Sequence, residues 1–213
     1  MIKYDLEKQA TLLFEENVIP LTRQNWQELL RLLVKSTYQH IITGDANENH
    51  SVWVSRYIND VASPLALNEF SKEIEAIVMS ASMRAFYKQF IGTDKICLRR
   101  CQANRMCEGD YIGEHKDQDS SPDYIATIVF HFSNDYTGGY FLTSNTDVGY
   151  SEEKRYKPGA RMALVNNCSI AHQVTKVERG ERLTLACFLS TSFSANTISP
   201  SEFKLGKSDA YDG

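Results

Sequence analysis

The N-terminal part of the chain places apolar residues at helical spacing. Apolar side chains recur every three or four positions after Asn25, which predicts a helix with Thr22 or Asn25 as its cap. Arg, Lys and Gln residues lie between them and would face solvent. The apolar positions of this predicted helix are Trp26, Leu29, Leu30, Leu32, Leu33 and Tyr38.

A second helical pattern covers the stretch from Leu67 or Asn68 to about Phe90, where apolar side chains again follow a helical period. The polar stretch 43–51, between the two patterns, is expected to be a loop because it is rich in Asn, Asp and Gly. The first ninety residues are therefore predicted to be largely helical.

After Thr93 the pattern changes to short segments with alternating apolar residues, which is typical of β-strands. Turn sequences that contain Gly or Pro separate these segments, and many short strands with regular turns predict a barrel or sandwich. The predicted strands are Ile96–Met106, Tyr124–Phe132, Gly139–Thr143, Ala160–Val165, Ala171–Val177 and Leu183–Leu189.

Helices at one end of the sequence and strands at the other predict an α+β fold, with the helices packed on one sheet. We expect residues 1–93 to form a helical support region and residues 94–192 to form the β core. Residues 193–213, rich in Ser, Asp, Gly and Lys, are expected to be a poorly ordered tail. The length of 213 residues fits one structural domain overall.

Composition and charge exclude several classes of protein. The chain has 23 Lys and Arg residues against 27 Asp and Glu residues, a formal net charge of −4, so it lacks a general attraction to nucleic acid or anionic membranes. No apolar run approaches the roughly 18 residues of a membrane span. The five cysteines form no CxxC pair. We expect a soluble, cytoplasmic protein with free thiols.

Three residues have the pattern of a metal site. His115 and Asp117 stand two positions apart, and in an extended strand such residues project to the same face. His172, much later in the chain and at the start of another predicted strand, can supply a third ligand. Two histidines and one carboxylate on one side of a metal are the ligand set of non-haem Fe(II) oxygenases, whose open positions accept a co-substrate and O2.

A basic residue in the last predicted strand complements this set. Alternation places Arg182 and Thr184 on one face, with Ala186 and Phe188, while the opposite face is uniformly apolar. A buried guanidinium needs an anionic partner, and its planar fork fits a carboxylate. A dicarboxylate that chelates the metal at one end would meet Arg182 at the other.

These residues occur in an order that resembles the catalytic core of the Fe(II)/2-oxoglutarate-dependent dioxygenases, most closely the prolyl-hydroxylase-like branch. The resemblance covers Arg105 to Ser190. It implies a double-stranded β-helix, or jelly roll, that binds Fe(II), 2-oxoglutarate and O2. The features that carry it are His115-Lys116-Asp117, a strand over Ile125–Phe132, Gly138-Gly139, Lys157-Pro158-Gly159, His172 and Arg182.

The resemblance also implies roles for individual residues. His115, Asp117 and His172 would be the catalytic metal ligands, and Arg182 would bind the distal carboxylate of 2-oxoglutarate with help from Thr184. His131 occupies the position where the family often has a Tyr that hydrogen-bonds 2-oxoglutarate. Because Asp117 is present, hydroxylation or another oxidation is favoured over halogenation, for which related enzymes replace this carboxylate with a small residue.

The reaction expected from the resemblance is hydroxylation of an unactivated C–H bond in a free amino acid or similar small polar metabolite. A peptidyl hydroxylase acting on Pro, Lys or Asn is an alternative, and a non-catalytic jelly-roll protein that retains a metal for binding or sensing is another. A nucleic-acid substrate is disfavoured, since that branch carries an Asn and a second Arg where this chain has Thr184 and Phe188. The sequence leaves the oligomeric state open.

Other polar residues have simpler expected roles. His40 and His50 lie in or beside the polar stretch and are expected to be solvated. A basic cluster is expected to be a solvated strand edge, with contact to an acidic substrate as the alternative. It consists of Lys95, Arg99, Arg100 and Arg105.

Overall fold

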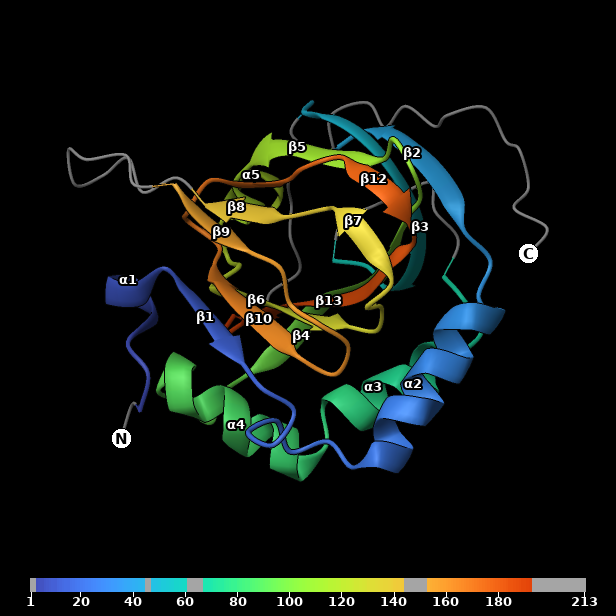
Figure 1. The fold of residues 1–213 in the computed structure, drawn as a ribbon. Coiled ribbons are helices and arrows are strands. Elements are labelled where there is room, and N and C mark those ends of the chain that lie inside the picture. The colour runs from blue at the N-terminus through green and yellow to red at the C-terminus, as the bar shows by residue number, and fades with distance from the viewer. Residues whose placement is uncertain (1–2, 45–46, 61–66, 144–152, 193–213) are drawn as a thin grey trace.

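The computed structural model describes residues 3–44, 47–60, 67–143 and 153–192. Within them most strands join one curled sheet in the order β1-β10-β6-β13-β4-β3-β5-β11-β8-β9, with β2 paired to β3 (Figure 1). All of these strand pairs are antiparallel. The strands of this sheet are β1 (Thr11–Phe14), β2 (Gln39–Thr43), β3 (Asn49–Ile58), β4 (Cys97–Met106), β5 (Tyr111–His115), β6 (Ala126–His131), β8 (Phe141–Thr143), β9 (Lys154–Tyr156), β10 (Ala163–Asn167), β11 (His172–Val174) and β13 (Arg182–Ser190).

The sheet folds over at β3, which takes part in both of its walls. The second half of this long strand pairs with β4, and its first half pairs with β5 through His50 and Ser51. The four strands β5, β11, β8 and β9 thereby form a wall opposite the larger wall from β1 to β3. A separate pair, β7 (Tyr136–Gly138) and β12 (Val177–Gly180), completes the strands. The predicted fold class, α+β with a double-stranded β-helix core and supporting helices on one sheet, is confirmed.

Three helices cover the outer side of the larger wall (Figure 1). The side chains that α2 (Arg23–Lys35), α3 (Ser71–Val78) and α4 (Ala81–Ile91) bury belong to the same apolar cluster as the outward side chains of β13. Those outward side chains are Leu183, Leu185, Cys187 and Leu189, as the alternation predicts. Burial of this apolar face against the helices orients the opposite, polar face of β13 toward the interior of the β-helix.

The helices begin and end at identifiable residues. Thr22 caps α2, because its hydroxyl accepts from the Asn25 N–H while the Asn25 side chain accepts from the Thr22 N–H, a reciprocal capping box.

Two short helices, α1 (Leu6–Gln9) and α5 (Asp117–Ser120), lie elsewhere. The single helix predicted to end near Phe90 is in fact α3 and α4. Ser80 has an extended backbone (φ −57°, ψ 159°), which separates them.

The prediction that the first ninety residues are largely helical is wrong for three segments. Strands β1, β2 and β3 lie there, and all three join the main sheet. Two of them also occupy part of the predicted polar loop, since β2 ends at Thr43 and β3 begins at Asn49. The alternation of Val52 and Val54 with Trp53 carried the strand signal. The tail predicted for 193–213 lies outside the described residues.

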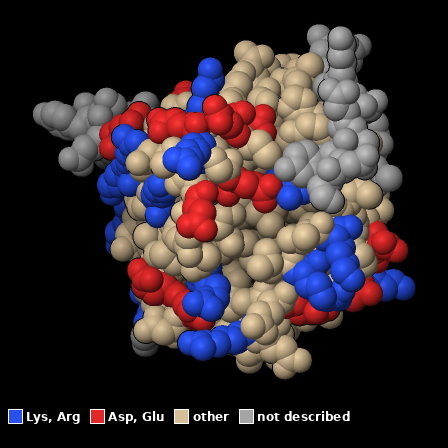
Figure 2. All heavy atoms as spheres, turned by 45° about the vertical axis from the view of Figure 1, so that its right-hand side comes forward, with Lys and Arg blue, Asp and Glu red and all other residues tan. Residues whose placement is uncertain are grey.

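The surface seen in Figure 2 carries charges of both signs. Lys and Arg side chains lie interspersed with Asp and Glu side chains there, in keeping with the net charge of −4. A continuous basic area of the kind that binds a phosphate backbone is therefore not a feature of this face within the described residues. Among those residues, none of the helices has the length and apolar character needed to cross a membrane.

Candidate metal centre and co-substrate pocket

The sheet register brings the two predicted histidine ligands together. His115 is the last residue of β5 and His172 is the first residue of β11, and the two are direct cross-strand partners. Their ring centroids are 4.4 Å apart. Asp117 does not lie on a strand, as the spacing argument assumed, but begins the short helix α5. Lys116 between them keeps an extended backbone (φ −109°, ψ 137°), so the side chains of His115 and Asp117 still project together.

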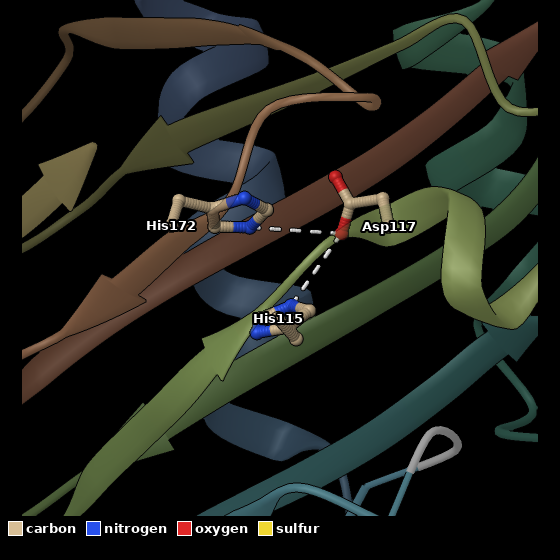
Figure 3. Close-up of side chains that lie close together, drawn as sticks. All are labelled: His115, Asp117 and His172. Carbon is tan, nitrogen blue, oxygen red and sulfur yellow. Dashed lines mark ion pairs between the residues drawn. The ribbon is translucent and has the colours of Figure 1, made fainter. Parts of the chain in front are cut away.

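The ligand atoms of the three residues converge on one point (Figure 3). Oδ1 of Asp117 lies 3.6 Å from Nε2 of His115 and 3.7 Å from Nε2 of His172. All three ligand atoms lie within 4.8 Å of one another, and Asp117 and His172 are buried. Two imidazole nitrogens and one carboxylate oxygen at these separations fit a single transition-metal ion on one side, with positions open on the other.

Backbone carbonyl groups orient both imidazoles for this role. Nδ1 of His115 lies 2.8 Å from the carbonyl oxygen of Gly113, and Nδ1 of His172 lies 3.0 Å from that of Ile170. When the rings are neutral, these carbonyl contacts favour a proton on Nδ1, which leaves Nε2 available as a metal ligand. Nδ1 of His172 also lies 3.1 Å from the amide nitrogen of Asn166. Phe141 stacks on the His172 ring at 5.1 Å and restrains its rotation.

Thr127 on β6 holds the carboxylate of the set. Its hydroxyl donates to Oδ2 of Asp117 at 2.6 Å, in a fully enclosed position. Because this hydrogen bond fixes Oδ2, the other carboxylate oxygen of Asp117, Oδ1, points toward the two histidines. The local sequence does not indicate this role of Thr127, because the two residues come from different elements, β6 and α5, that only the fold brings together.

Replacing Thr127 with valine is expected to weaken metal binding by about 10- to 100-fold, the usual cost of losing an outer-shell partner. Valine preserves the shape of the side chain but leaves Oδ2 of Asp117 buried without its donor. The measurement is a titration of the purified variant with Mn(II). Thr127→Ser, which retains the hydroxyl, is the matched control, and equal affinities for Thr127→Val and the wild type would contradict the role.

The electrostatics of the metal-free set favour a bound cation. Burial alone would raise the pKa of Asp117, but the charge of His172 and the hydrogen bond and charge of His115 outweigh it and keep that pKa well below its usual range. Burial lowers the pKa of His115, but the hydrogen bond and charge of Asp117 and the Gly113 carbonyl raise it to about 9. The pKa of His172 is lowered, mainly by burial. The carboxylate is thus ionised and ready to meet positive charge.

Metal binding is expected to release about one proton at pH 7, because His115 must lose its proton before Nε2 can act as a ligand. The free protein holds that proton until the pH passes about 9, against 6.5 for an unperturbed histidine. Metal affinity should therefore rise between these two values and level off above the higher one. Calorimetric titration in buffers of different ionisation enthalpy measures the release. Affinity that is constant across this pH range would contradict it.

Arg182 lies in the same cavity as the three candidate ligands and is 2% exposed. Its Nη1 has a weak contact with Sδ of Met106 at 3.6 Å, and its Nε has no hydrogen-bond partner among the described residues. Burial lowers the pKa of Arg182, and the neighbouring Tyr136 hydroxyl opposes this. A buried guanidinium with donors to spare fits the carboxylate of a bound anion.

The Gly138-Gly139 turn is shaped around Arg182. Gly139 has a left-handed backbone (φ 59°), and a Cβ on it would lie 3.1 Å from Cδ of Arg182 and 3.1 Å from the ring of Tyr136. A larger residue would press on the guanidinium stem, so glycine serves both the turn and the pocket. Sequence reasoning noted this turn but not Tyr136.

Thr184 and His131 are cross-strand partners at the fully buried end of the cavity wall. The Thr184 hydroxyl has one long contact, 3.4 Å to the carbonyl oxygen of Asn104, and lines the cavity. Nε2 of His131 is buried and has no hydrogen-bond partner among the described residues. Burial and then the charge of Arg182 hold the pKa of His131 well below its usual range, so the ring is neutral.

Several residues expected on the surface line the cavity or are buried elsewhere instead. His50 lines the cavity, pairs with Glu48 at 3.1 Å and lies 5.7 Å from the His115 ring, so it is not a solvated histidine. Arg99 and Arg100 are buried rather than part of a solvated edge. Arg99 donates to Asp60 at 2.6 Å, whereas Arg100 lines the cavity. The sequence alone does not distinguish Arg99 from Arg100, because it does not show which face of β4 is turned toward the cavity.

The double-stranded β-helix and its His-Asp-His set define a class of non-haem metal oxygenase. Residues 101–190 match the sequence model described as the 2OG-Fe(II) oxygenase superfamily. This match spans the elements that carry the three ligands and Arg182, and together with the site it supports an Fe(II)/2-oxoglutarate-dependent dioxygenase. No curated protein matched the sequence.

Solved structures share the fold. An oxidoreductase of the 2OG-Fe(II) oxygenase family from Burkholderia pseudomallei is 25% identical, with a TM-score of 0.77 and 90% of each chain covered. A Pseudomonas putida prolyl-4-hydroxylase is 15% identical, with a TM-score of 0.58 and coverage of 87% of this chain and 95% of that one. HygX from Streptomyces hygroscopicus, solved with nickel and 2-oxoglutarate bound, is 9% identical, with a TM-score of 0.63 and 94% of each chain covered.

Proposed function

We propose that His115, Asp117 and His172 hold Fe(II), and that Arg182 binds the distal carboxylate of 2-oxoglutarate. The observation that carries this assignment is that the two Nε2 atoms, Oδ1 of Asp117 and the buried guanidinium all belong to one cavity. Their types also match the cofactors that name the superfamily. Thr184 and His131 are proposed to assist, supported by their place beside Arg182 and by the unused donor or acceptor on His131.

When bound, Fe(II) and 2-oxoglutarate supply an oxidation by O2 in which one oxygen atom enters a substrate C–H bond and the other converts 2-oxoglutarate to succinate and CO2. The protein's own residues orient the metal ligands and enclose the co-substrate. Thr127 directs the Asp117 carboxylate, and backbone carbonyls direct both histidines. Arg182 supplies positive charge to the co-substrate, and apolar residues that line the cavity, among them Val54, Phe141 and Val174, help to exclude water from it.

The substrate is proposed to be a free amino acid or a similar small polar metabolite that is hydroxylated at an unactivated C–H bond. Polar and charged side chains on the inner wall of the cavity support a polar ligand: Arg56, Arg100, Gln102 and Asn104. A peptidyl hydroxylase is the second candidate. It is supported by the likeness in fold to prolyl hydroxylases, one of which was solved with a peptide fragment of a hypoxia inducible factor from Trichoplax adhaerens.

The test loads the protein with Fe(II) and 2-oxoglutarate under argon, admits O2 and measures succinate. Free amino acids and tryptic peptides are supplied separately, and products are analysed by mass spectrometry for the gain of one oxygen atom. Gain on free amino acids is the expected result. Gain only on peptides would select the second candidate. A protein that forms no succinate with any pool would be a metal-retaining binding protein instead.

A cytoplasmic location is proposed on the basis of the cysteines. All five are free thiols, and Cys101 and Cys187 form no disulfide although they are cross-strand partners whose Sγ atoms lie 3.6 Å apart. Free thiols and ferrous iron both persist best in reducing surroundings. Fractionation of cells that express the tagged protein measures the location, and recovery of the protein from an oxidising compartment would contradict the proposal.

A further inference from the structure

Cys168 is a fully buried side chain beside the candidate metal centre. It follows β10 directly and begins the segment 168–171, which leads to His172 at the start of β11. Its Sγ lies 3.3 Å from Oγ1 of Thr127, the hydroxyl that donates to Asp117. The thiol is therefore within one hydrogen bond of the residue that holds a candidate ligand.

The backbone of Cys168 joins three elements of the site. Its carbonyl oxygen accepts from the backbone N–H of Gln118 in α5 at 3.1 Å, and its own N–H donates to the carbonyl oxygen of Ile125 at 3.2 Å. Gln118 follows Asp117 in α5, and Ile125 immediately precedes β6. The segment that leads to β11 is thus fixed against both α5 and the start of β6.

The hydrogen bonds around Thr127 determine the direction of the thiol contact. A hydroxyl has one proton to donate and two lone pairs to accept with. Thr127 donates its proton to Oδ2 of Asp117 at 2.6 Å, so Oγ1 accepts from its sulfur neighbour. The thiol of Cys168 keeps its proton, because burial raises its pKa well above the usual value. A chain of two hydrogen bonds therefore runs from Cys168 through Thr127 to Asp117.

This chain restricts the hydroxyl of Thr127. A hydroxyl rotates about its C–O bond, and a donor on one of its lone pairs limits that rotation. Hydrogen bonds in a chain also polarise one another, so the S–H group strengthens the bond from Thr127 to the carboxylate. A thiol is a weak donor, and its effect on the metal centre should be smaller than that of the Thr127 hydroxyl itself.

We propose that Cys168 is a positioning residue of the metal centre, and that its thiol acts on Asp117 through the hydroxyl of Thr127. This rests on the proposed function, because it takes Asp117 to be a metal ligand. Within the described residues the converging ligand atoms belong to His115, Asp117 and His172, so Cys168 acts from outside the ligand set.

The chain contains a matched thiol for the control. Cys187 on β13 is also fully buried, and its Sγ lies 3.6 Å from that of Cys101. It belongs to the apolar cluster beneath the helices. Cys168→Ala and Cys187→Ala each remove one buried sulfur atom, so both should lower the stability of the fold in a similar way. Only Cys168→Ala removes the hydrogen bond to Thr127.

The first experiment measures Mn(II) affinity by calorimetric titration of the purified variants. Cys168→Ala should bind Mn(II) about 10-fold more weakly than the wild type, the lower end of the cost of losing an outer-shell partner. Cys168→Ser retains a donor and should recover to within about threefold of the wild type. Cys187→Ala should bind as the wild type does. Wild-type affinity in Cys168→Ala, no recovery in Cys168→Ser, or an equal loss in Cys187→Ala overturns the proposal.

The second experiment tests whether the thiol acts through Thr127. Thr127→Val has no hydroxyl to accept from the S–H group, so adding Cys168→Ala to it should change Mn(II) affinity by less than about twofold. If the double variant instead loses the product of the two single effects, Cys168 acts by another route and the proposal fails. Cys168→Val, which also lacks a donor but fills the space of the thiol, replaces Cys168→Ala in both experiments if the alanine variant does not fold.

The two proposals fail in different ways. If His172→Ala keeps the metal affinity of the wild type, the ligand assignment under the proposed function fails, and the role of Cys168 fails with it. If His172→Ala loses the metal while Cys168→Ala binds Mn(II) as the wild type does, only the positioning role of Cys168 is rejected.

Discussion

His172→Ala is expected to abolish 2-oxoglutarate turnover and to weaken metal binding by more than about 100-fold, the upper end of the cost of losing an outer-shell partner. The variant removes one of the three ligand atoms that lie within 4.8 Å of one another. It leaves Asp117 buried and ionised beside His115 alone, and two protein ligands do not fix the geometry of the metal. The measurements are Mn(II) affinity and the rate of succinate formation after O2 is admitted.

A histidine outside the cavity provides the control. His40 stacks on Trp53 at 4.8 Å and bonds Ser51, and its side chain does not reach the three ligands. His40→Ala should keep wild-type metal affinity and wild-type succinate formation. If His172→Ala still makes succinate at the wild-type rate, the assignment of the ligand set is wrong.

Arg182→Gln is expected to raise the KM for 2-oxoglutarate by about 30-fold or more, as befits loss of one member of a buried charge pair. Arg182 is 2% exposed, and its Nε has no hydrogen-bond partner among the described residues. Glutamine can donate to the co-substrate carboxylate but brings no charge, so the carboxylate would be desolvated without compensation. Steady-state succinate formation against 2-oxoglutarate concentration measures the change.

Metal affinity separates this effect from general damage. Arg182→Gln should bind Mn(II) as the wild type does, because Arg182 is not a ligand. Arg179→Gln, at an exposed position on β12, is the control for loss of a positive charge and should keep the wild-type KM. A wild-type KM in Arg182→Gln would show that another residue binds the distal carboxylate.

Local spacing carried most of the information about the metal centre. His115 and Asp117 are separated by one residue with an extended backbone, so their side chains meet whether the second lies on a strand or at the start of a helix. The alternation in β13 likewise separated Arg182 and Thr184 from the apolar residues that pack under the helices. Both inferences need only the geometry of a few neighbouring residues.

The pairing of strands that are distant in the sequence could not be inferred from local spacing. Nothing near His172 in the sequence states that it is the cross-strand partner of His115, or that Thr127 bonds Asp117. The segment 49–58 was mistaken for part of a helical region with a loop, although it is the strand that joins the two walls and carries Arg56. Pairing between distant strands depends on which apolar faces are buried together, and that is a property of the whole fold.

The sequence by itself determined the types of chemical group available: two histidines and a carboxylate for a metal, an interior arginine for an anion, and an apolar face for the helices. The tertiary structure decided which of the remaining charges face the cavity. Arg99 and Arg100 are neighbours in sequence, but one pairs with Asp60 and the other lines the site. Successive residues of a strand point to opposite sides, and only the folded sheet with its covering helices decides which side is the interior.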